Sequence, residues 1–405
     1  MNKKISLGIT IGLMALAAAV TFIITYNYSL NVFNSKVKSV SEKESIYTRL
    51  SEMDKYVRAN YINDIDEDML NNSIMNGYIS GLDDRFAKYY SAEEYAQQTQ
   101  KESGVDVGLG FSYEKEESGY IKITEITPNS SSETAGLQVG DVVTAINNTD
   151  VIAFEGGYDE AVKLLICDEG TKVKLHVKRT NLEGVSEFFA VEVVSERTEI
   201  VSVTGRLIDK IAYIKITTFN EKTPEQFAAV LNGLIAEGAE MIIFDVRDNL
   251  GGLTEALQGT LDYVLGDGDV VTAYYRNSSE VVIKTTEANQ IKLPMAVLVN
   301  GNTASCSELF AFALRDEANA QIVGTKTYGK GVMQNTHKLT GGAAVKITVA
   351  TLQTKNSGDY NGVGITPNFE VVLPTEIELA LLTEEQQLEA DTQLIKAIEV
   401  VSTIQ

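Results

Sequence analysis

Residues 300–334 read NGNTASCSELFAFALRDEANAQIVGTKTYGKGVMQ, and the rest of the chain is interpreted outward from them. Five apolar residues, Met295–Val299, precede this stretch and predict a buried strand. A break at Gly301-Asn302 then leads into a helix that begins near Ser305, and the stretch ends just past Lys330. A serine at a helix N-terminus and a lysine between two glycines are parts of a serine–lysine hydrolase, but also of a capped helix and a solvated loop.

Ser305 and Lys330 each have two interpretations that local sequence does not separate. The pattern Ser305-x-x-Glu308 is a capping box, with which ordinary helices begin. A lysine acts as a base only when it is neutral, and an unperturbed lysine costs roughly 4.6 kcal/mol to deprotonate at pH 7. Burial has to supply most of that cost, so the catalytic interpretation predicts that Lys330 is buried.

Composition excludes several other classes of protein. The formal charge of −22 argues against nucleic-acid binding, which needs basic patches. The chain has no G-x-S-x-G nucleophile motif and no H-E-x-x-H metal motif, and we do not expect His176 or His337 to be a catalytic base. Only two cysteines occur, Cys167 and Cys306, and no C-x-x-C, so we expect no disulfide framework, no metal site and no cofactor.

The N-terminal segment, residues 1–28, is predicted to be a membrane anchor or a signal segment. Two lysines precede an uncharged apolar run, Ile5–Ile24, whose 20 residues span about 30 Å as a helix, the thickness of the hydrocarbon core. The run continues past the small residues Ala15–Ala19, where a signal peptidase could cut, so an uncleaved anchor is favoured. Both alternatives place the remaining chain outside the cytoplasm.

The rest of the chain is predicted to form a linker and four larger parts. Residues 29–43, rich in Ser, Asn and Lys, are predicted to be the linker, and helical periodicity predicts a helical domain at 44–100. Short strands and turns predict a β-rich domain at 101–182, followed by an α/β core at 183–372. A helix from about Glu376 is predicted in the C-terminal segment 373–405.

The β-rich segment resembles a PDZ domain. Gly108-Leu109-Gly110-Phe111 matches the carboxylate-binding loop of these domains, and Ala135-Gly136-Leu137 with Gly140-Asp141 matches their core. Glycines let successive backbone N–H groups turn toward one anion, and the neighbouring strand edge can pair with an extended peptide. The resemblance implies that residues 108–111 bind a peptide's C-terminal carboxylate. Relatives of this kind often carry Arg-Gly where this chain has Ile166-Cys167.

The core resembles the carboxyl-terminal processing peptidases, also called tail-specific proteases. In this family S-A-S-x-S-E contains the catalytic serine, and the lysine of T-[FY]-G-K-G-x-x-Q lies 25 residues further on. This chain has TASCSE at 303–308 and TYGKGVMQ at 327–334, and the spacing selects Ser305 rather than Ser307. The resemblance implies Ser305 as nucleophile, Lys330 as general base and Gln334 as the residue that positions the lysine. Residues four apart on a strand are about 13 Å apart, so a Lys330–Gln334 contact requires a break in the strand.

Two oxyanion donors complete the implied site. The family motif D-L-R-x-N-x-G-G corresponds to DVRDNLGG at 245–252, with Leu250 in place of the usual proline, and it implies the Gly251 amide as one donor. The amide of Cys306, at the helix N-terminus, is the other candidate. We expect the Cys306 side chain to be a small buried hydrophobic group rather than a nucleophile.

The resemblance implies a serine endopeptidase that cleaves extracytoplasmic proteins near their C-termini while the PDZ domain holds the terminal carboxylate. It also implies a crotonase-like α/β core with an inserted PDZ domain, and a homodimer formed through the helical segments. The alternative is a non-catalytic PDZ scaffold, whose degenerate core should lack at least one of Ser305, Lys330 and Gln334. An acyl-CoA enzyme on the same fold is disfavoured, because the chain shows no pattern of a CoA site and CoA is absent outside the cytoplasm.

Overall fold

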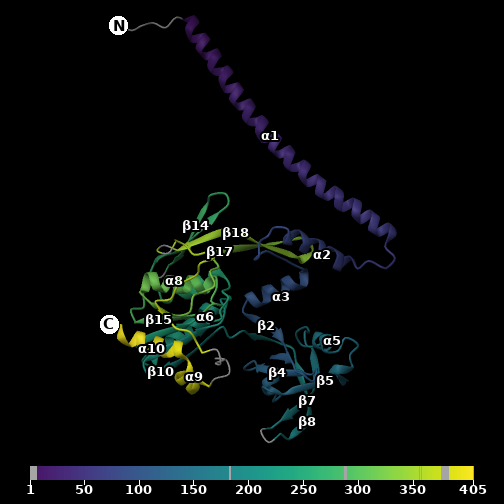
Figure 1. Cartoon of the computed structure of the whole chain (residues 1–405), viewed down its shortest axis with the longest axis vertical. Coiled ribbons are helices and arrows are strands. Elements are labelled where there is room, and N and C mark those ends of the chain that lie inside the picture. The colour runs from purple at the N-terminus through teal and green to yellow at the C-terminus, as the bar shows by residue number, and fades with distance from the viewer. Residues whose placement is uncertain are drawn as a thin grey trace. The chain divides into compact units, whose positions relative to one another are not determined.

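The computed structural model describes residues 7–181, 184–286, 290–354, 356, 358–374 and 383–404. The chain forms two compact units, Met1–Met75 and Asn76–Gln405. The first contains helix α1 (Leu7–Asn60) and the beginning of α2 (Glu67–Ser80), the purple and blue helices of Figure 1. Within α1, the apolar stretch Gly12–Leu30 is 19 residues long, which is enough to cross a membrane.

Helix α1 runs without a break through residues 29–43, where the composition predicts a linker. The physical reason is that this segment contains neither proline nor glycine, the residues that end helices most effectively. Polar composition by itself therefore did not interrupt the helix. The predicted start of the C-terminal helix near Glu376 lies outside the described residues, and α9 (Glu384–Ala390) and α10 (Thr392–Thr403) follow it.

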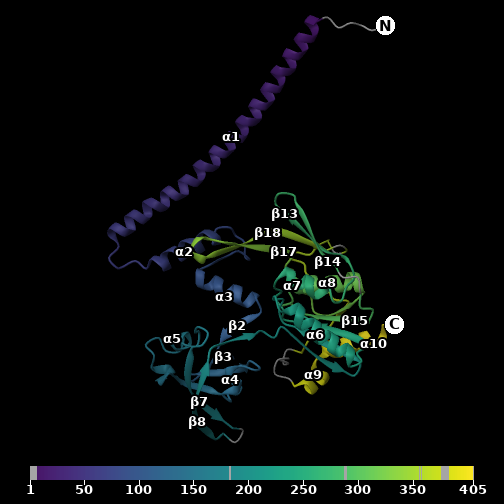
Figure 2. The same ribbon diagram turned by 180° about the vertical axis from the view of Figure 1, so that it is seen from behind.

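The PDZ-like segment is a six-stranded antiparallel sheet with three short helical elements. The strand order is β3-β4-β5-β7-β8, and β6 pairs with β5. Its elements are β3 (Phe111–Lys115), β4 (Ile121–Ile126), α4 (Ser131–Thr134), β5 (Val142–Ile146), β6 (Thr149–Asp150), η1 (Val151–Ala153), α5 (Tyr158–Lys163), β7 (Lys172–Thr180) and β8 (Ser186–Val194). Strand β8 pairs along all of β7, as Figure 2 shows, so the sheet extends to Val194, past the boundary predicted at residue 182.

The α/β core is built on a mostly parallel sheet of order β10-β11-β12-β15-β16-β20. Strands β11, β12, β15, β16 and β20 run parallel, and β10 is the antiparallel edge strand. The strands are β10 (Val203–Ile208), β11 (Ile211–Ile216), β12 (Met241–Asp245), β15 (Met295–Val299), β16 (Gln321–Gly324) and β20 (Phe369–Glu370). The helices between them are α6 (Thr223–Ala236), α7 (Thr254–Leu261) and α8 (Cys306–Ala318).

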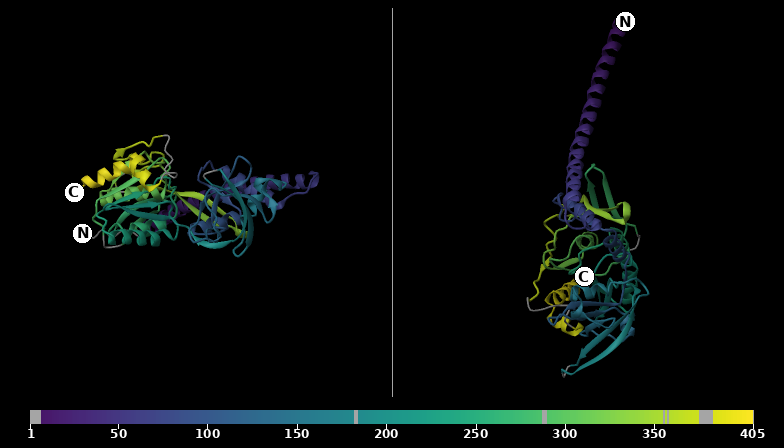
Figure 3. Two further views of the ribbon diagram at one scale, coloured as in Figure 1. Left: turned by 90° about the horizontal axis from the view of Figure 1, so that it is seen from below. Right: turned by 90° about the vertical axis from the view of Figure 1, so that its right-hand side faces the viewer.

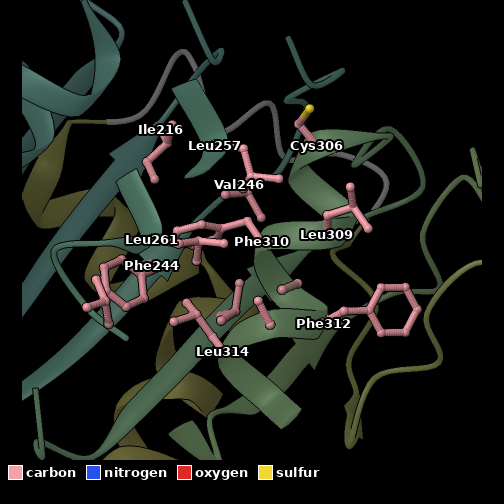
Figure 4. Packing of buried hydrophobic residues seen from close by; sticks show 14 of the residues in the cluster. Ile216, Phe244, Val246, Leu257, Leu261, Cys306, Leu309, Phe310, Phe312 and Leu314 are labelled. Carbon is pink, nitrogen blue, oxygen red and sulfur yellow. The ribbon is translucent and has the colours of Figure 1, made fainter. Parts of the chain in front are cut away.

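Alternate residues of the central strands enter two different hydrophobic clusters. On β12, Phe244 packs with Phe310 of α8 in the cluster that Figure 4 shows, whereas Ile243 faces Leu394 and Ala397 of α10. Both faces of this sheet are therefore buried, and α10, yellow in Figure 3, covers one of them. This explains why Met295–Val299 is apolar at every position instead of alternating.

A second six-stranded sheet includes the strand that follows the loop 325–331, which contains Lys330 and is called the lysine loop. Its path is β1-β18-β13-β14, and β17 and β19 also pair with β18. The strands are β1 (Lys88–Tyr90), β13 (Gly268–Tyr275), β14 (Glu280–Thr285), β17 (Val332–Lys338), β18 (Ala344–Thr354) and β19 (Gly358–Asp359), with η2 (Thr340–Gly342) between β17 and β18. Helix α3 (Ala92–Glu102) and strand β2 (Val105–Gly108) precede the PDZ-like segment in sequence, and β9 (Glu196–Glu199) follows it. Strands β2 and β9 pair with each other.

Topology alone brings three loops to one edge of the parallel sheet. Strands β12, β15 and β16 are neighbours and run in the same direction. The loop after β12 contains Gly251, the turn after β15 contains Ser305, and the loop after β16 contains Lys330. Ligands of open α/β sheets bind at the carboxyl ends of the strands, so a site is expected at this edge.

Candidate active site

Ser305 occupies a strained turn between β15 and α8. Its backbone angles are φ 58° and ψ −120°, a region that residues with a side chain seldom adopt. A serine that merely caps a helix has extended backbone angles instead. Strained strand-to-helix turns of this kind hold the exposed nucleophile of other hydrolases, so the backbone of Ser305 favours the nucleophile over the cap.

Glu308 connects the serine turn to the lysine loop. Its buried carboxylate accepts hydrogen bonds from the amide of Ser305 (3.0 Å), the hydroxyl of Thr327 (2.6 Å) and the amides of Gly329 (2.7 Å) and Lys330 (2.8 Å). The four donors satisfy a carboxylate that would otherwise be costly to bury. Glu308 therefore fixes the two backbone segments that carry the candidate nucleophile and base.

Lys330 is half-buried, and burial is the largest cause that lowers its pKa. The positive charge of Lys346 on β18 lowers the pKa further. The flanking glycines allow close backbone packing, because a methyl group on Gly329 would lie 2.8 Å from the Gly364 amide nitrogen and one on Gly331 would lie 2.7 Å from that of Asn361. The ammonium nitrogen lies 4.8 Å from the centre of the Phe86 ring. The environment of Lys330 is thus unlike that of a solvated loop lysine.

Gln334 lies at an irregularity in β17. The pairing with β18 shifts register between Met333 and Gln334, and Lys330 lies before the strand begins. Both features depart from the ideal strand on which the two residues would be far apart. The Nε2 group of Gln334 donates to the hydroxyl of Thr348 (3.2 Å).

A cleft of about 660 Å³ brings the candidate residues together, and its lining includes Ser305, Cys306, Lys330 and Gln334. Apolar side chains from the second sheet form much of its wall: Ala273, Val281, Ile283, Val332, Met333, Val349 and Leu352. Among the described residues, no hydrogen bond joins the Ser305 hydroxyl to Lys330, whose ammonium group faces Phe86. Catalytic hydrogen bonds are often open in a free enzyme and close when substrate binds.

The two predicted oxyanion donors lie next to each other. A methyl group on Gly251 would lie 2.9 Å from Cβ of Ser305 and 3.0 Å from the amide nitrogen of Cys306, so only glycine fits here. The amide of Cys306 has no acceptor among the described residues, as expected at the start of a helix. The Gly251 amide donates to Oδ1 of Asn249 (2.9 Å), so in this structure it is not free.

Alternative nucleophiles and bases are poorly placed. Burial raises the pKa of the Cys306 thiol to about 11, and its Sγ donates to the carbonyl of Gly252 (3.3 Å). Ser307 is fully buried. Neither His176, in the PDZ-like sheet, nor His337, exposed on β17, lines the cleft.

The Gly108–Phe111 loop has the features of an anion site. Carbonyl oxygens of Leu109 and Gly110 accept from the hydroxyls of Ser132 (2.5 Å) and Ser130 (3.2 Å). Among the described residues, the amides of Leu109 and Gly110 have no acceptor. Strand β3, which begins at Phe111, is an edge strand and so offers unpaired backbone groups to a peptide.

Sequence reasoning missed several residues of this site. Glu308 was recognised only as part of a capping box, although that pattern pointed to it. Leu82-Asp83-Asp84 was recognised only as a match to the family, without a role in the site, and Phe86 and Thr348 gave no signal. Asp84 and its partner Thr348 are 264 positions apart in the chain. Such contacts follow from the tertiary fold alone.

The chain is similar to known peptidases and to PDZ domains. Peptidase family S41 matches residues 210–371, and the PDZ domain family matches residues 122–179. The carboxy-terminal processing protease CtpA of Bacillus subtilis is 29% identical over 368 residues, covering 90% of this chain and 77% of the relative. The chloroplastic carboxyl-terminal-processing peptidase 1 of Arabidopsis thaliana is 29% identical over 303 residues, covering 73% of this chain and 61% of the relative.

A solved structure shows the same fold. A Bacteroides fragilis protein described as an S41 protease superposes with a TM-score of 0.52 at 16% identity, over 85% of this chain and 99% of that one. The fold and the matched families define a serine peptidase with a PDZ domain. The relatives that the chain resembles, at 29% identity, are carboxyl-terminal processing peptidases, and its core matches peptidase family S41.

Proposed function

We propose that the chain is an endopeptidase of the serine–lysine type, which cleaves extracytoplasmic proteins near their C-termini. The observation that carries this proposal is the meeting of Ser305, on its strained turn, with the half-buried Lys330 in one cleft. A degenerate, non-catalytic core would have lost one of these groups, and none is missing. The apolar wall of the cleft suits apolar side chains beside the scissile bond.

In the proposed first step, neutral Lys330 takes the proton of the Ser305 hydroxyl as Oγ attacks the scissile carbonyl carbon. The lysine side chain has to swing from the Phe86 ring toward Ser305. Collapse of the tetrahedral intermediate breaks the C–N bond, and Lys330 gives its proton to the leaving amine. Water then attacks the acyl-enzyme by the same route, regenerating the Ser305 hydroxyl and releasing the new carboxylate.

The oxyanion of each tetrahedral intermediate is proposed to bind the amides of Cys306 and Gly251. The Cys306 amide is at the N-terminus of α8, whose dipole also favours negative charge. Gly251 has to exchange its bond to Asn249 for a bond to the substrate oxygen. Its contact with the Ser305 turn places it near enough to do so.

The pH dependence of kcat/KM should reveal the lysine. Lys330 is active only when neutral, so activity is absent well below its pKa and rises as the pH rises through it. Because burial and Lys346 lower this pKa, the midpoint is expected below the value of about 10.4 of an unperturbed lysine. A profile of kcat/KM against pH measures it. A midpoint near about 6.5 that disappears in His337→Gln would instead assign the base to His337.

Peptide cleavage tests the function as a whole. A peptide with an apolar C-terminus and a free carboxylate is expected to be cut at an internal bond, as mass spectrometry of the products would show. The same peptide with an amidated C-terminus should bind roughly 10-fold to 100-fold more weakly, because hydrogen bonds to a charged group contribute about 1.5–3 kcal/mol. The proposed receptor for the carboxylate is the pair of unbonded amides at Leu109 and Gly110.

Two outcomes would overturn parts of this proposal. Equal cleavage and equal affinity for both peptides would remove the carboxylate-binding role of Gly108–Phe111 and leave the peptidase in place. Binding of both peptides without cleavage of either would favour the non-catalytic scaffold.

The location of the enzyme is also part of the proposal. The apolar stretch Gly12–Leu30 of α1 would anchor the chain in the membrane, with the PDZ domain and peptidase core on the extracytoplasmic side. The crotonase-like classification of the core and the homodimer stay predictions from the family resemblance.

A further inference from the structure

The segment Asp84–Phe86 lies outside the residues matched by the peptidase family, yet it contacts the candidate site at three points. The Phe86 ring lies against the Lys330 ammonium group, and Asp84 accepts hydrogen bonds from Thr348, the partner of Gln334. Arg85 stacks over the Phe86 ring (4.6 Å) and over Tyr328 of the lysine loop (5.3 Å).

We propose that Asp84 and Phe86 are positioning residues of the serine–lysine site, Asp84 acting on Gln334 through Thr348 and Phe86 acting on Lys330. The inference rests on the proposed function and adds to it a segment that precedes the PDZ domain in sequence. The site is then incomplete without residues that the peptidase core does not supply.

Asp84 sets the direction of a chain of hydrogen bonds. Its carboxylate accepts from the amide (3.0 Å) and the hydroxyl (3.2 Å) of Thr348. Burial alone would raise the pKa of Asp84, but hydrogen bonds from the amides of Phe86 and Thr348 outweigh it and lower the pKa, which keeps the carboxylate ionised. An ionised carboxylate only accepts, so the Thr348 hydroxyl has to donate to it.

The orientation of the Gln334 amide follows from that direction. Since the Thr348 hydroxyl uses its proton on Asp84, its oxygen is the acceptor for Nε2 of Gln334 (3.2 Å). The carbonyl oxygen of Gln334 is then the end of the amide left to accept an N–H of Lys330. Asp84 thereby selects which end of Gln334 can serve the lysine.

Phe86 controls how much water reaches Lys330. The Asp84 carboxylate also accepts from the Phe86 amide (3.0 Å), so the same residue that orients Gln334 holds the ring in place. The ring excludes water from the ammonium group, which favours neutral lysine, whereas the electron-rich ring face favours the charged form. Burial is the larger effect on the pKa of Lys330, so loss of the ring should admit water and favour the charged form.

Other charged groups around Lys330 remain when Phe86 is replaced. Lys346 of β18 and Arg85 oppose the positive charge of Lys330, and Glu308 of α8 favours it, as does the Cys306 thiolate form. Arg85 stacks over the Phe86 ring, so replacing Phe86 also changes the surroundings of Arg85. A shift in the Lys330 titration that persists in an Arg85→Met background is therefore assigned to the lost cover.

The proposed role of Phe86 is tested by titrating Lys330, a measurement that does not depend on peptidase activity. In the Ser305→Ala chain, the rate of Lys330 acetylation by acetic anhydride at each pH, read by mass spectrometry, reports the fraction of neutral amine. Phe86→Ala is expected to raise the midpoint by roughly one pH unit or more, and Phe86→Leu, which keeps an apolar cover, should leave it near the parent value. The matched control is Phe369→Ala, because that ring contacts Lys396 at 5.2 Å in another part of the fold. An unchanged midpoint in Phe86→Ala would overturn the proposed role of Phe86.

The proposed role of Asp84 is tested by a double-mutant cycle with Gln334 in the otherwise native chain. Asp84→Asn should lower kcat by roughly ten-fold with little change in KM, since it disturbs a group used in the transition state. In a Gln334→Ala background the same change should add almost nothing, whereas a purely structural role would give additive losses and refute the relay. If the parent chain cleaves no peptide, the proposed function fails and the proposed role of Asp84 fails with it. The acetylation result still decides the role of Phe86.

Discussion

Ser305→Ala is expected to lower kcat/KM for peptide hydrolysis by at least about 10,000-fold while the chain stays folded. The physical reason is that no other hydroxyl or thiol at the start of α8 is both accessible and activated. A serine that only capped the helix would cost about 1 kcal/mol of stability when replaced, and would leave catalysis intact. A 10,000-fold loss corresponds to about 5.4 kcal/mol of transition-state stabilisation, so the two roles differ clearly in size and in kind.

Ser307, two positions after Ser305, provides the control for this prediction. Ser307 is fully buried, and its hydroxyl has no hydrogen-bond partner among the described residues, so Ser307→Ala should preserve activity. Peptide turnover and urea unfolding of both variants supply the measurements. Retention of full activity in Ser305→Ala together with loss in Ser307→Ala would move the nucleophile to Ser307.

Much of the fold was predictable because the core strands carry an unambiguous pattern. Met295–Val299 is apolar at every position, and the structure places a strand with two buried faces there. The helix through residues 29–43 was missed, because a polar composition was taken as a sign of a break although no helix-ending residue is present.

The chemistry of Ser305 could not be separated from capping by local sequence, and a second serine shows why. Ser91 and Ser305 both precede a glutamate by three residues. Each serine forms a capping box with its glutamate, but Ser91 has extended backbone angles (φ −60°, ψ 168°), whereas Ser305 has φ 58° and ψ −120°. Glu308 differs from Glu94 in bonding the amides of a loop 21 and 22 positions away. The difference between the two serine turns is therefore set by tertiary contacts.

The neighbours of the lysine were the least predictable part of the site. The spacing of 25 residues linked Lys330 to Ser305, but Phe86, whose ring lies 4.8 Å from the lysine nitrogen, is 244 positions earlier in the chain. Gln334 was predicted from a motif against the geometry of an ideal strand. The register shift at Met333–Gln334 departs from the ideal strand, and a contact between Lys330 and Gln334 stays a prediction.

Arg247→Met is expected to lower the free energy of unfolding by about 3–5 kcal/mol, the cost of breaking a buried ion pair by removing one partner. Arg247 follows β12 and begins the loop that carries Gly251. Its guanidinium group bonds Asp245 (2.6 Å), Asp391 (2.8 Å) and the side-chain carbonyl of Gln393 (3.0 Å), and all of these residues are buried. Because Asp391 caps α10, the same arginine joins the site-bearing loop to the helix that covers the sheet. Urea unfolding of both forms measures the difference.

The pH dependence of this loss separates an unpaired charge from a simple packing defect. In the native chain burial would raise the pKa of Asp245, but Arg247 outweighs it and holds the pKa below its usual value. That pairing contributes its full stabilisation above pH about 3.9, the pKa of an aspartate in the unfolded chain. The stabilisation is lost only as the pH falls through the lower pKa that Asp245 has in the folded chain. Without Arg247, burial raises the pKa of Asp245, so lowering the pH neutralises the unpaired carboxylate. The loss of unfolding free energy in Arg247→Met should therefore shrink as the pH falls from about 7 to about 5.

A surface ion pair provides the matched control. Lys210 and Glu240 lie 2.7 Å apart with more than half of each side chain exposed (62% and 61%), so Lys210→Met should cost no more than about 1 kcal/mol at either pH. A second comparison adds Asp245→Asn and Asp391→Asn to Arg247→Met, which removes both stranded charges and should recover part of the lost stability at neutral pH. A deficit in Arg247→Met that is the same at both pH values and unaffected by the asparagines would show that Arg247 acts through packing alone. Recovery would show that the loop carrying Gly251 is held to α10 by charge.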